Sequence, residues 1–163
     1  MTEVEWLACC DPDAMFSFTA DRVDSQLLEL FGCACCRRIF DLLADQRSRR
    51  AEEVRELLAQ GKATEAECSE AIRLAAYARR DARAPLRLAA NVDELSPDLT
   101  PALAAGAAFN ASRGLYRVAA NFATRAVACG TPSDWQAAFA AERKAQCQLI
   151  REFIGGQVWT GRT

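Results

Sequence analysis

The stretch Leu27–Leu43 reads LLELFGCACCRRIFDLL and has the pattern of one amphipathic helix. A helix advances about 100° per residue, so side chains three or four positions apart share a face. One such face carries five apolar residues: Leu28, Phe31, Cys35, Ile39 and Leu42. This stripe predicts the core side of a central helix over about 25–45.

Helix start and stop signals recur along the chain. Thr2 and Thr64 each precede a glutamate by three positions, which is the pattern of a capping box. Three further cap residues stand directly before a proline: Ser96, Thr100 and Thr131. Glycines follow several of the periodic segments: Gly61, Gly130 and Gly155-Gly156. Because no segment alternates apolar and polar residues as a strand does, we predict an all-α protein.

These signals predict seven helical segments. They lie at about 3–10, 12–20, 25–45, 48–60, 64–83, 101–129 and 132–154. Gly106, Asn110 and Gly114 lower the helix propensity of the sixth segment, so we expect a bend or break there. The expected architecture is a single-domain, irregular or orthogonal bundle of five to seven helices over 1–155, with a non-helical C-terminal tail at 156–163.

The composition is that of a globular protein, with 51% hydrophobic and 26% charged residues. Twenty basic and 22 acidic residues give a net charge of −2. The protein as a whole therefore has no electrostatic attraction for nucleic acid or for an anionic membrane. The N-terminus is acidic and lacks the basic start of a signal peptide, and no apolar run is long enough to cross a bilayer. We expect a cytoplasmic protein whose eight cysteines are free thiols.

The cysteine run Cys33-Ala34-Cys35-Cys36 allows two interpretations. Cys36 lies about 100° and Cys33 about 160° around the helix from Cys35, so the three thiols do not converge on one ion. Buried packing is the first interpretation, because free cysteine is among the most buried residue types. The alternative is a thiol-based metal or redox site, in which Cys33 and Cys36 share an ion with distant ligands such as Cys9 and Cys10.

Catalytic signatures are missing from the sequence. The chain has no histidine, which removes the commonest general base and the commonest partner of a nucleophilic cysteine. It also has no phosphate-binding loop, no dinucleotide fingerprint and no nucleophile elbow. We therefore expect a non-enzymatic protein with no cofactor.

The charged residues predict one ion pair and raise the hypothesis of a nucleic-acid surface. Arg38 falls beside the apolar stripe, where its guanidinium needs a partner, and Asp41 or Asp45 would serve. Two basic clusters could form a nucleic-acid surface if they shared one face: Arg47, Arg49, Arg50, Arg79, Arg80 and Arg83. Neighbouring acids such as Glu52 and Glu53 favour solvated helix faces, so nucleic acid is an unlikely partner.

By exclusion, the sequence favours a protein-interaction or accessory module. The alanine-rich segment 101–129 offers a small-residue face through which copies of the chain could associate. Exposed aromatic residues tend to anchor interfaces, which makes Trp6, Trp135 and Trp159 candidates if they prove accessible. A protein partner or self-association is expected, with no membrane partner.

The N-terminal third resembles a large paralogous family of uncharacterised bacterial helical proteins. The resemblance covers about residues 3–61 and rests on Glu5-Trp6-Leu7, on Asp11-Pro12 and on Cys33-Ala34-Cys35-Cys36-Arg37-Arg38. The family pattern often continues with tryptophan and histidine after the isoleucine, where this chain has Phe40 and Asp41. The resemblance implies a helical fold unit and no particular activity.

Overall fold

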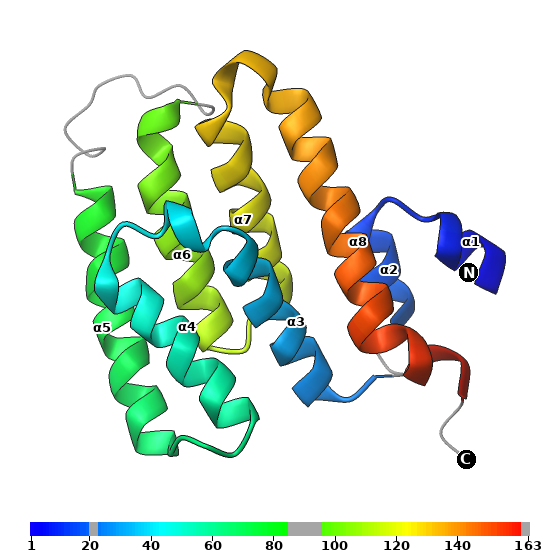
Figure 1. Ribbon diagram of the computed structural model, residues 1–163, viewed down its shortest axis with the longest axis horizontal. Coiled ribbons are helices and arrows are strands. Elements are labelled where there is room, and N and C mark those ends of the chain that lie inside the picture. Colours follow the sequence, from blue (N-terminus) through cyan, green and yellow to red (C-terminus); the bar gives the residue numbers. More distant parts are fainter. Residues whose placement is uncertain (20–22, 85–95, 161–163) are drawn as a thin grey trace.

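Figure 1 shows the computed structural model, which describes residues 1–19, 23–84 and 96–160. All regular structure in this part of the chain is helical, with no strand, which confirms the all-α class. Eight α-helices occur in these residues, one more than the upper limit expected. The difference arises because the predicted segment 101–129 forms two helices.

The eight helices are α1 (Glu3–Ala8), α2 (Pro12–Thr19), α3 (Ser25–Arg38), α4 (Gln46–Ala59), α5 (Glu65–Arg83), α6 (Thr100–Ser112), α7 (Tyr116–Gly130) and α8 (Trp135–Thr160). Three short 3-10 segments join some of them: η1 (Phe40–Leu42), η3 (Pro97–Leu99) and η4 (Pro132–Asp134).

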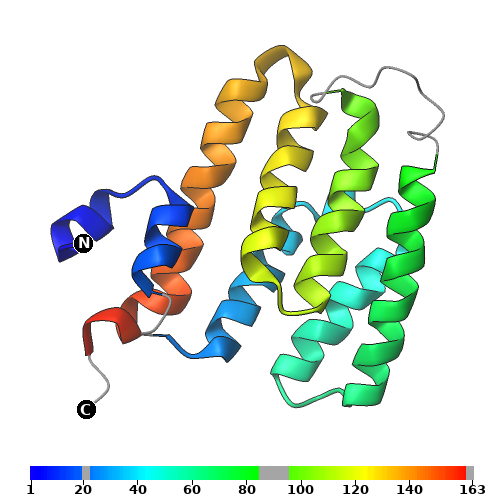
Figure 2. The same ribbon diagram turned by 180° about the vertical axis from the view of Figure 1, so that it is seen from behind.

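The helices form a layer with two further helices across one face. In Figure 1, α5, α6, α7 and α8 lie side by side in chain order, and α3 and α4 cross in front of them. Figure 2 shows the same layer from behind, with α3 and α4 on its far side. Helix α2 packs on α8, and α1 lies at the edge near the end of α8. The first and last described helices therefore lie at the same edge of the molecule, where Trp6 contacts Trp159.

Side-chain caps set several of the helix starts. The Thr2 hydroxyl accepts a hydrogen bond from the Glu5 amide at 3.2 Å, and the Glu5 carboxylate accepts one from the Thr2 amide at 2.7 Å. Thr64 and Glu67 repeat this arrangement at α5, so both predicted capping boxes are confirmed. Thr131 differs from the expectation, because its hydroxyl donates to the Val127 carbonyl instead of capping the next helix.

Glycines separate some helices but not all. Gly114 has φ +71°, a left-handed conformation that ends the α6 region and turns the chain into α7, where a break was expected. Gly61 has φ +69° and ends the α4 region in the same way. Gly155 and Gly156, by contrast, remain inside α8, which continues to Thr160. The expected non-helical tail is corrected accordingly: its first five residues are helical.

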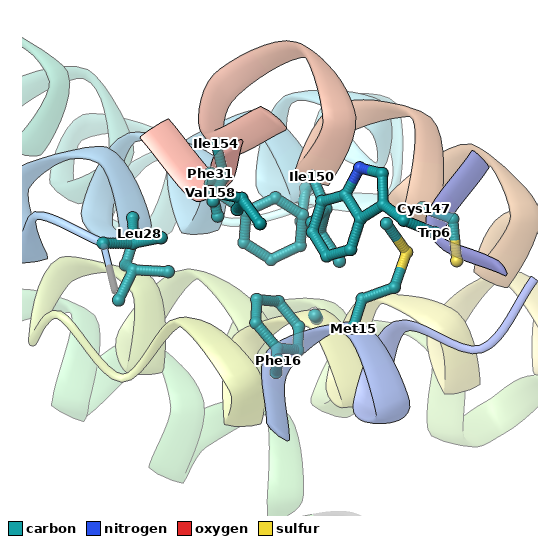
Figure 3. Packing of buried hydrophobic residues seen from close by; sticks show 12 residues of the cluster. Trp6, Met15, Phe16, Leu28, Phe31, Cys147, Ile150, Ile154 and Val158 are labelled. Atoms are coloured by element: carbon teal, nitrogen blue, oxygen red, sulfur yellow. The ribbon is translucent and has the colours of Figure 1, made fainter. Parts of the chain in front are cut away.

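The core surrounds α3. One cluster joins α2, α3 and α8, and Figure 3 shows Phe16, Phe31 and Ile150 meeting within it. The rings of Phe16 and Phe31 lie edge to face with centroids 5.0 Å apart. A second cluster joins the end of α3 with α6 and α7, and a third lies between α4 and α5.

The alanine-rich segment lies inside the protein. Alanines on both α6 and α7 are fully buried, including Ala104, Ala107, Ala119 and Ala123. Small side chains allow these helices to approach closely, and they leave no free alanine face for a second copy of the chain. This face is therefore used within the monomer, and self-association stays a prediction.

Candidate functional site

The three thiols of α3 are all buried, each in a different environment. Cys35 belongs to the core between α3 and α8, and Cys36 to the core formed with α6 and α7. Cys33 is directed toward α4, where its thiol interacts with the carboxyl of Glu52. Six of the eight cysteines are buried, which agrees with the packing interpretation.

Glu52 is the most unusual polar residue of this region. Its side chain on α4 is fully buried, and neither carboxyl oxygen has a hydrogen-bond partner of ordinary geometry. The thiols of Cys33 and Cys36 are close enough to act as weak donors to it. Burial raises the pKa of Glu52 to about 8, against the lowering effect of the two thiols. The carboxyl is therefore mostly protonated at neutral pH.

The sequence predicted that Glu52 lies on a solvated helix face, and this is corrected: its side chain is fully buried. Glu52 lies four residues after Ser48, which is also fully buried with an unpartnered hydroxyl. Ser48 and Glu52 share the buried face of α4 with the apolar residues Ala51 and Val54. The packing of α3, α5 and α6 against α4 removes this face from water.

The thiols are poorly suited to nucleophilic chemistry where they stand. Burial raises the pKa of Cys33 and Cys36 well above the usual value, and the neighbouring Glu52 raises both further. Burial also raises the pKa of Cys35, with a contribution from Glu142, and that of Cys147 to about 12. The thiolate is the nucleophilic form, so raised pKa values leave these groups in the wrong protonation state for that role.

The four cysteines of the metal hypothesis do not gather at one point. Across residues 1–19, 23–84 and 96–160, no three cysteine, aspartate or glutamate side chains are arranged to hold an ion. Cys9 and Cys10 lie between α1 and α2, where the Cys9 thiol donates to the Asp11 carbonyl at 3.4 Å. Their electrostatic effect reaches Cys147 on α8.

Arg38 pairs with a residue that the sequence did not suggest. Its guanidinium donates to both carboxylate oxygens of Glu142 on α8, at 3.0 and 3.1 Å. Asp41 is exposed, and Asp45 caps α4 and binds Arg47 at 2.7 Å. The expected pairing with Asp41 or Asp45 is corrected: α8 packs beside α3 and presents Glu142 from 104 positions away along the chain.

A buried polar network extends from this ion pair. The Gln146 side-chain amide donates to the Ala120 carbonyl at 3.0 Å and to the Thr124 hydroxyl at 2.9 Å. It also donates to Glu142 at 3.4 Å. The network ties α3, α7 and α8 together and satisfies polar groups that are otherwise costly to bury.

The arginines of the nucleic-acid hypothesis have different surroundings. Arg47 binds both Asp45 and Asp81, and Arg50 approaches Glu53 at 3.5 Å. Arg49 donates to the Leu43 carbonyl at 2.6 Å. The three arginines of the first basic cluster therefore each interact with an acceptor of the protein itself. Of the second cluster, Arg80 approaches Asp81 at 3.5 Å, and Arg79 and Arg83 line a cavity on α5.

The three tryptophans lie at different depths. Trp6 is 1% exposed and belongs to the core, so it is corrected from a candidate interface anchor to a core residue. Trp135 is partly exposed at the start of α8. Trp159 is 42% exposed at the end of α8 and contacts Trp6 edge to face, with centroids 6.5 Å apart.

Comparison with known proteins finds no relative. No protein family matches the sequence, and no curated protein or solved structure matches it either. The family resemblance of the N-terminal third stays a prediction. None of the described helices combines the length and apolar character required to cross a membrane.

Proposed function

We propose that this protein is a non-enzymatic interaction module that binds a partner protein through its α1–α8 corner. We define the α1–α8 corner by three exposed apolar side chains: Val4, Leu7 and Trp159. Val4 is 77% and Leu7 63% exposed, and both lie on α1, one helical turn apart. The exposure of these apolar side chains on α1 and at the end of α8 is the observation that carries the proposal.

The corner is rigid enough to act as a preformed surface. Trp159 rests against Trp6 and also contacts the ring of Phe18, with centroids 5.9 Å apart. Arg151 on α8 donates to the carbonyls of Trp6 and Cys9, which holds the end of α1 against α8. A supported tryptophan loses little further conformational freedom on binding, which is why such residues serve as interface anchors.

Charge at the corner favours a particular class of partner. Glu3 and Glu5 are exposed on the same short helix as Val4 and Leu7. A symmetric contact between two copies would bring these carboxylates together, which opposes self-association there. We therefore propose a partner protein with an apolar patch bordered by basic side chains.

The absence of histidine and the protonated thiols support a non-enzymatic role. The eight free cysteines support the expected reducing, cytoplasmic location.

The test compares Leu7→Asp with Val118→Asp. Val118 on α7 is 43% exposed and lies outside the corner, so it provides a matched change in charge. Proteins retained by the wild type and by Val118→Asp but lost with Leu7→Asp would be purified, and their affinity measured at increasing salt. We expect binding that weakens with salt. Equal retention by both variants, or dimerisation abolished by Leu7→Asp, would contradict the proposed partner.

A thiol-based metal or redox protein is the second candidate. The observation that favours it is that the thiols of Cys33 and Cys36 both interact with the Glu52 carboxyl between α3 and α4; as they stand, these three side chains are not arranged to hold an ion, so a metal would have to rearrange them. Metal analysis of anaerobically purified protein, with thiols titrated before and after unfolding, separates the two functions. The interaction module predicts that the six buried thiols react only after unfolding. One equivalent of metal that shields thiols until a chelator is added would establish the second candidate.

A further inference from the structure

A cavity of about 340 Å³ opens between the end of α5, the beginning of α6 and the middle of α7. It lies in the α5–α6–α7 part of the layer, away from the α1–α8 corner (Figure 1). Its volume falls within the range of sites that hold small molecules. Seven residues line it: Arg79, Arg83, Leu99, Ala102, Leu103, Phe122 and Arg125.

The polar lining of this cavity is entirely cationic. Within the described chain, no carboxylate lies within 4.0 Å of the guanidinium of Arg79, Arg83 or Arg125. Eleven other arginines in that part of the chain do have such a partner or a backbone acceptor, for example Arg47 and Arg73. Three positive charges that have no carboxylate partner among the described residues raise the local potential of this cavity and favour an anion.

Arg79 is positioned by its surroundings. Its guanidinium lies over the Phe109 ring at 4.9 Å, and it borders a second hollow of about 200 Å³ that also involves Arg80. Stacking restricts the long side chain, so less freedom is lost when it binds a ligand. The first turn of α6 borders the cavity through Ala102 and Leu103, and the partial positive charge of a helix start adds to the potential.

The remaining lining is apolar. Leu99, Leu103 and Phe122 provide a surface that a bare inorganic ion would leave unused. Phe122 reaches its place because Gly106 on α6 has no side chain: a Cβ there would lie 2.5 Å from the Phe122 ring. The cavity therefore joins a cationic rim with an aromatic and aliphatic floor.

We propose that this cavity binds a small phosphate monoester whose organic part is aromatic or apolar. The planar guanidinium groups match the oxygen geometry of phosphate, and the dianion is favoured by several arginines together. The organic part packs on Phe122 and the leucines, which removes apolar surface from water. This binding site is independent of the partner surface at the α1–α8 corner.

Isothermal titration calorimetry with phenyl phosphate tests the proposal, with inorganic phosphate and phenol as reference ligands. Phenyl phosphate is expected to bind at least about tenfold more tightly than either reference, because it uses both halves of the cavity. Arg79→Gln and Arg125→Gln should each weaken its binding by about five- to tenfold. Arg73→Gln is the matched control, because Arg73 is exposed on the same helix, binds Glu70 and lies outside the cavity.

Three outcomes would overturn the proposal. Equal affinity for inorganic and phenyl phosphate would mean that the apolar floor contributes nothing. Equal weakening by Arg73→Gln and Arg79→Gln would indicate diffuse attraction instead of a site. Binding of a single-stranded oligonucleotide without binding of phenyl phosphate would assign the arginines to a nucleic-acid backbone.

Discussion

Glu52 shows how one residue can link the protonation and the stability of this protein. Its carboxyl is buried between α3 and α4, and the folded state holds a proton that the unfolded chain releases above the usual pKa of 4.5. Because the folded pKa is raised to about 8, the folded state binds more protons between these two values. Its contribution to stability is thus most favourable below pH 4.5 and is lost as the pH rises toward 8.

We predict that Glu52→Gln removes this pH dependence. The free energy of unfolding of the wild type should decline relative to that of the variant by about 1.4 kcal/mol per pH unit between roughly pH 5 and 8. Urea unfolding at several pH values measures the difference between the two proteins. Parallel pH profiles for both proteins would show that Glu52 reaches water in the folded state.

The coupling energy between Arg38 and a candidate carboxylate identifies the partner of Arg38. A double-mutant cycle of Arg38→Ala with Glu142→Ala should give a coupling energy of about 1 kcal/mol or more, because Glu142 is buried and accepts two charged hydrogen bonds. The control cycle of Arg38→Ala with Asp41→Ala should give a coupling near zero. Strong coupling to Asp41 and none to Glu142 would restore the pairing expected from sequence and contradict the observed one.

At the scale of elements, two glycines have different roles, one in a turn between helices and one inside a helix. Gly114 adopts a left-handed conformation, and a Cβ there would meet Arg55 and Glu29 at 3.3 Å. Gly156 lies within α8, and a Cβ there would meet no atom within 4 Å. The first glycine is required by the turn between α6 and α7, whereas the second only lowers the helix propensity of α8.

The paired substitutions Gly114→Ala and Gly156→Ala test this difference. Gly114→Ala should lower the free energy of unfolding by about 1 kcal/mol or more, because alanine is strained at positive φ. Gly156→Ala should leave it unchanged or raise it by up to about 1 kcal/mol, since alanine is a better helix former. Thermal or urea unfolding checks both. Destabilisation by Gly156→Ala would indicate that α8 ends before this position.

At the scale of the whole molecule, the first and last described helices contribute to one core. Val158 is buried in the same cluster as Trp6, and Trp159 covers Trp6 and Phe18. The boundary expected at residue 155 therefore passes through a packed region. The contacts between α1 and α8 join Trp6 to Trp159 and to Arg151.

Ending the chain after Gly155 should therefore destabilise the whole protein. Loss of the buried Val158 and of the cover on Trp6 should lower the free energy of unfolding by at least about 2 kcal/mol. The emission of the exposed Trp6 should also shift toward longer wavelength. Unfolding curves and tryptophan fluorescence of the shortened chain measure both effects. Unchanged stability and emission would support an independent tail.

Local signals by themselves determined the helical class and many helix limits of this protein. Capping boxes at Thr2 and Thr64 and the left-handed turn at Gly61 involve residues close in sequence, so their spacing alone predicts them. The predicted stripe from Leu28 to Leu42 is fully buried as far as Ile39. The single helix expected over 25–45 is corrected: α3 ends at Arg38, and Leu42 is half-buried in η1.

Only the tertiary structure decided the partners of these helices. Glu142 for Arg38 and Glu52 for the α3 thiols come from other helices, whose faces no local pattern places together. The helical end of α8 forms despite two glycines because its last turn packs on Trp6. The arginine cavity likewise combines three helices, and its positive charges come together only where α5, α6 and α7 meet. Contacts between residues distant in sequence depend on how the helices pack together. The periodicity of apolar residues along one helix does not determine which other helix its buried face will meet.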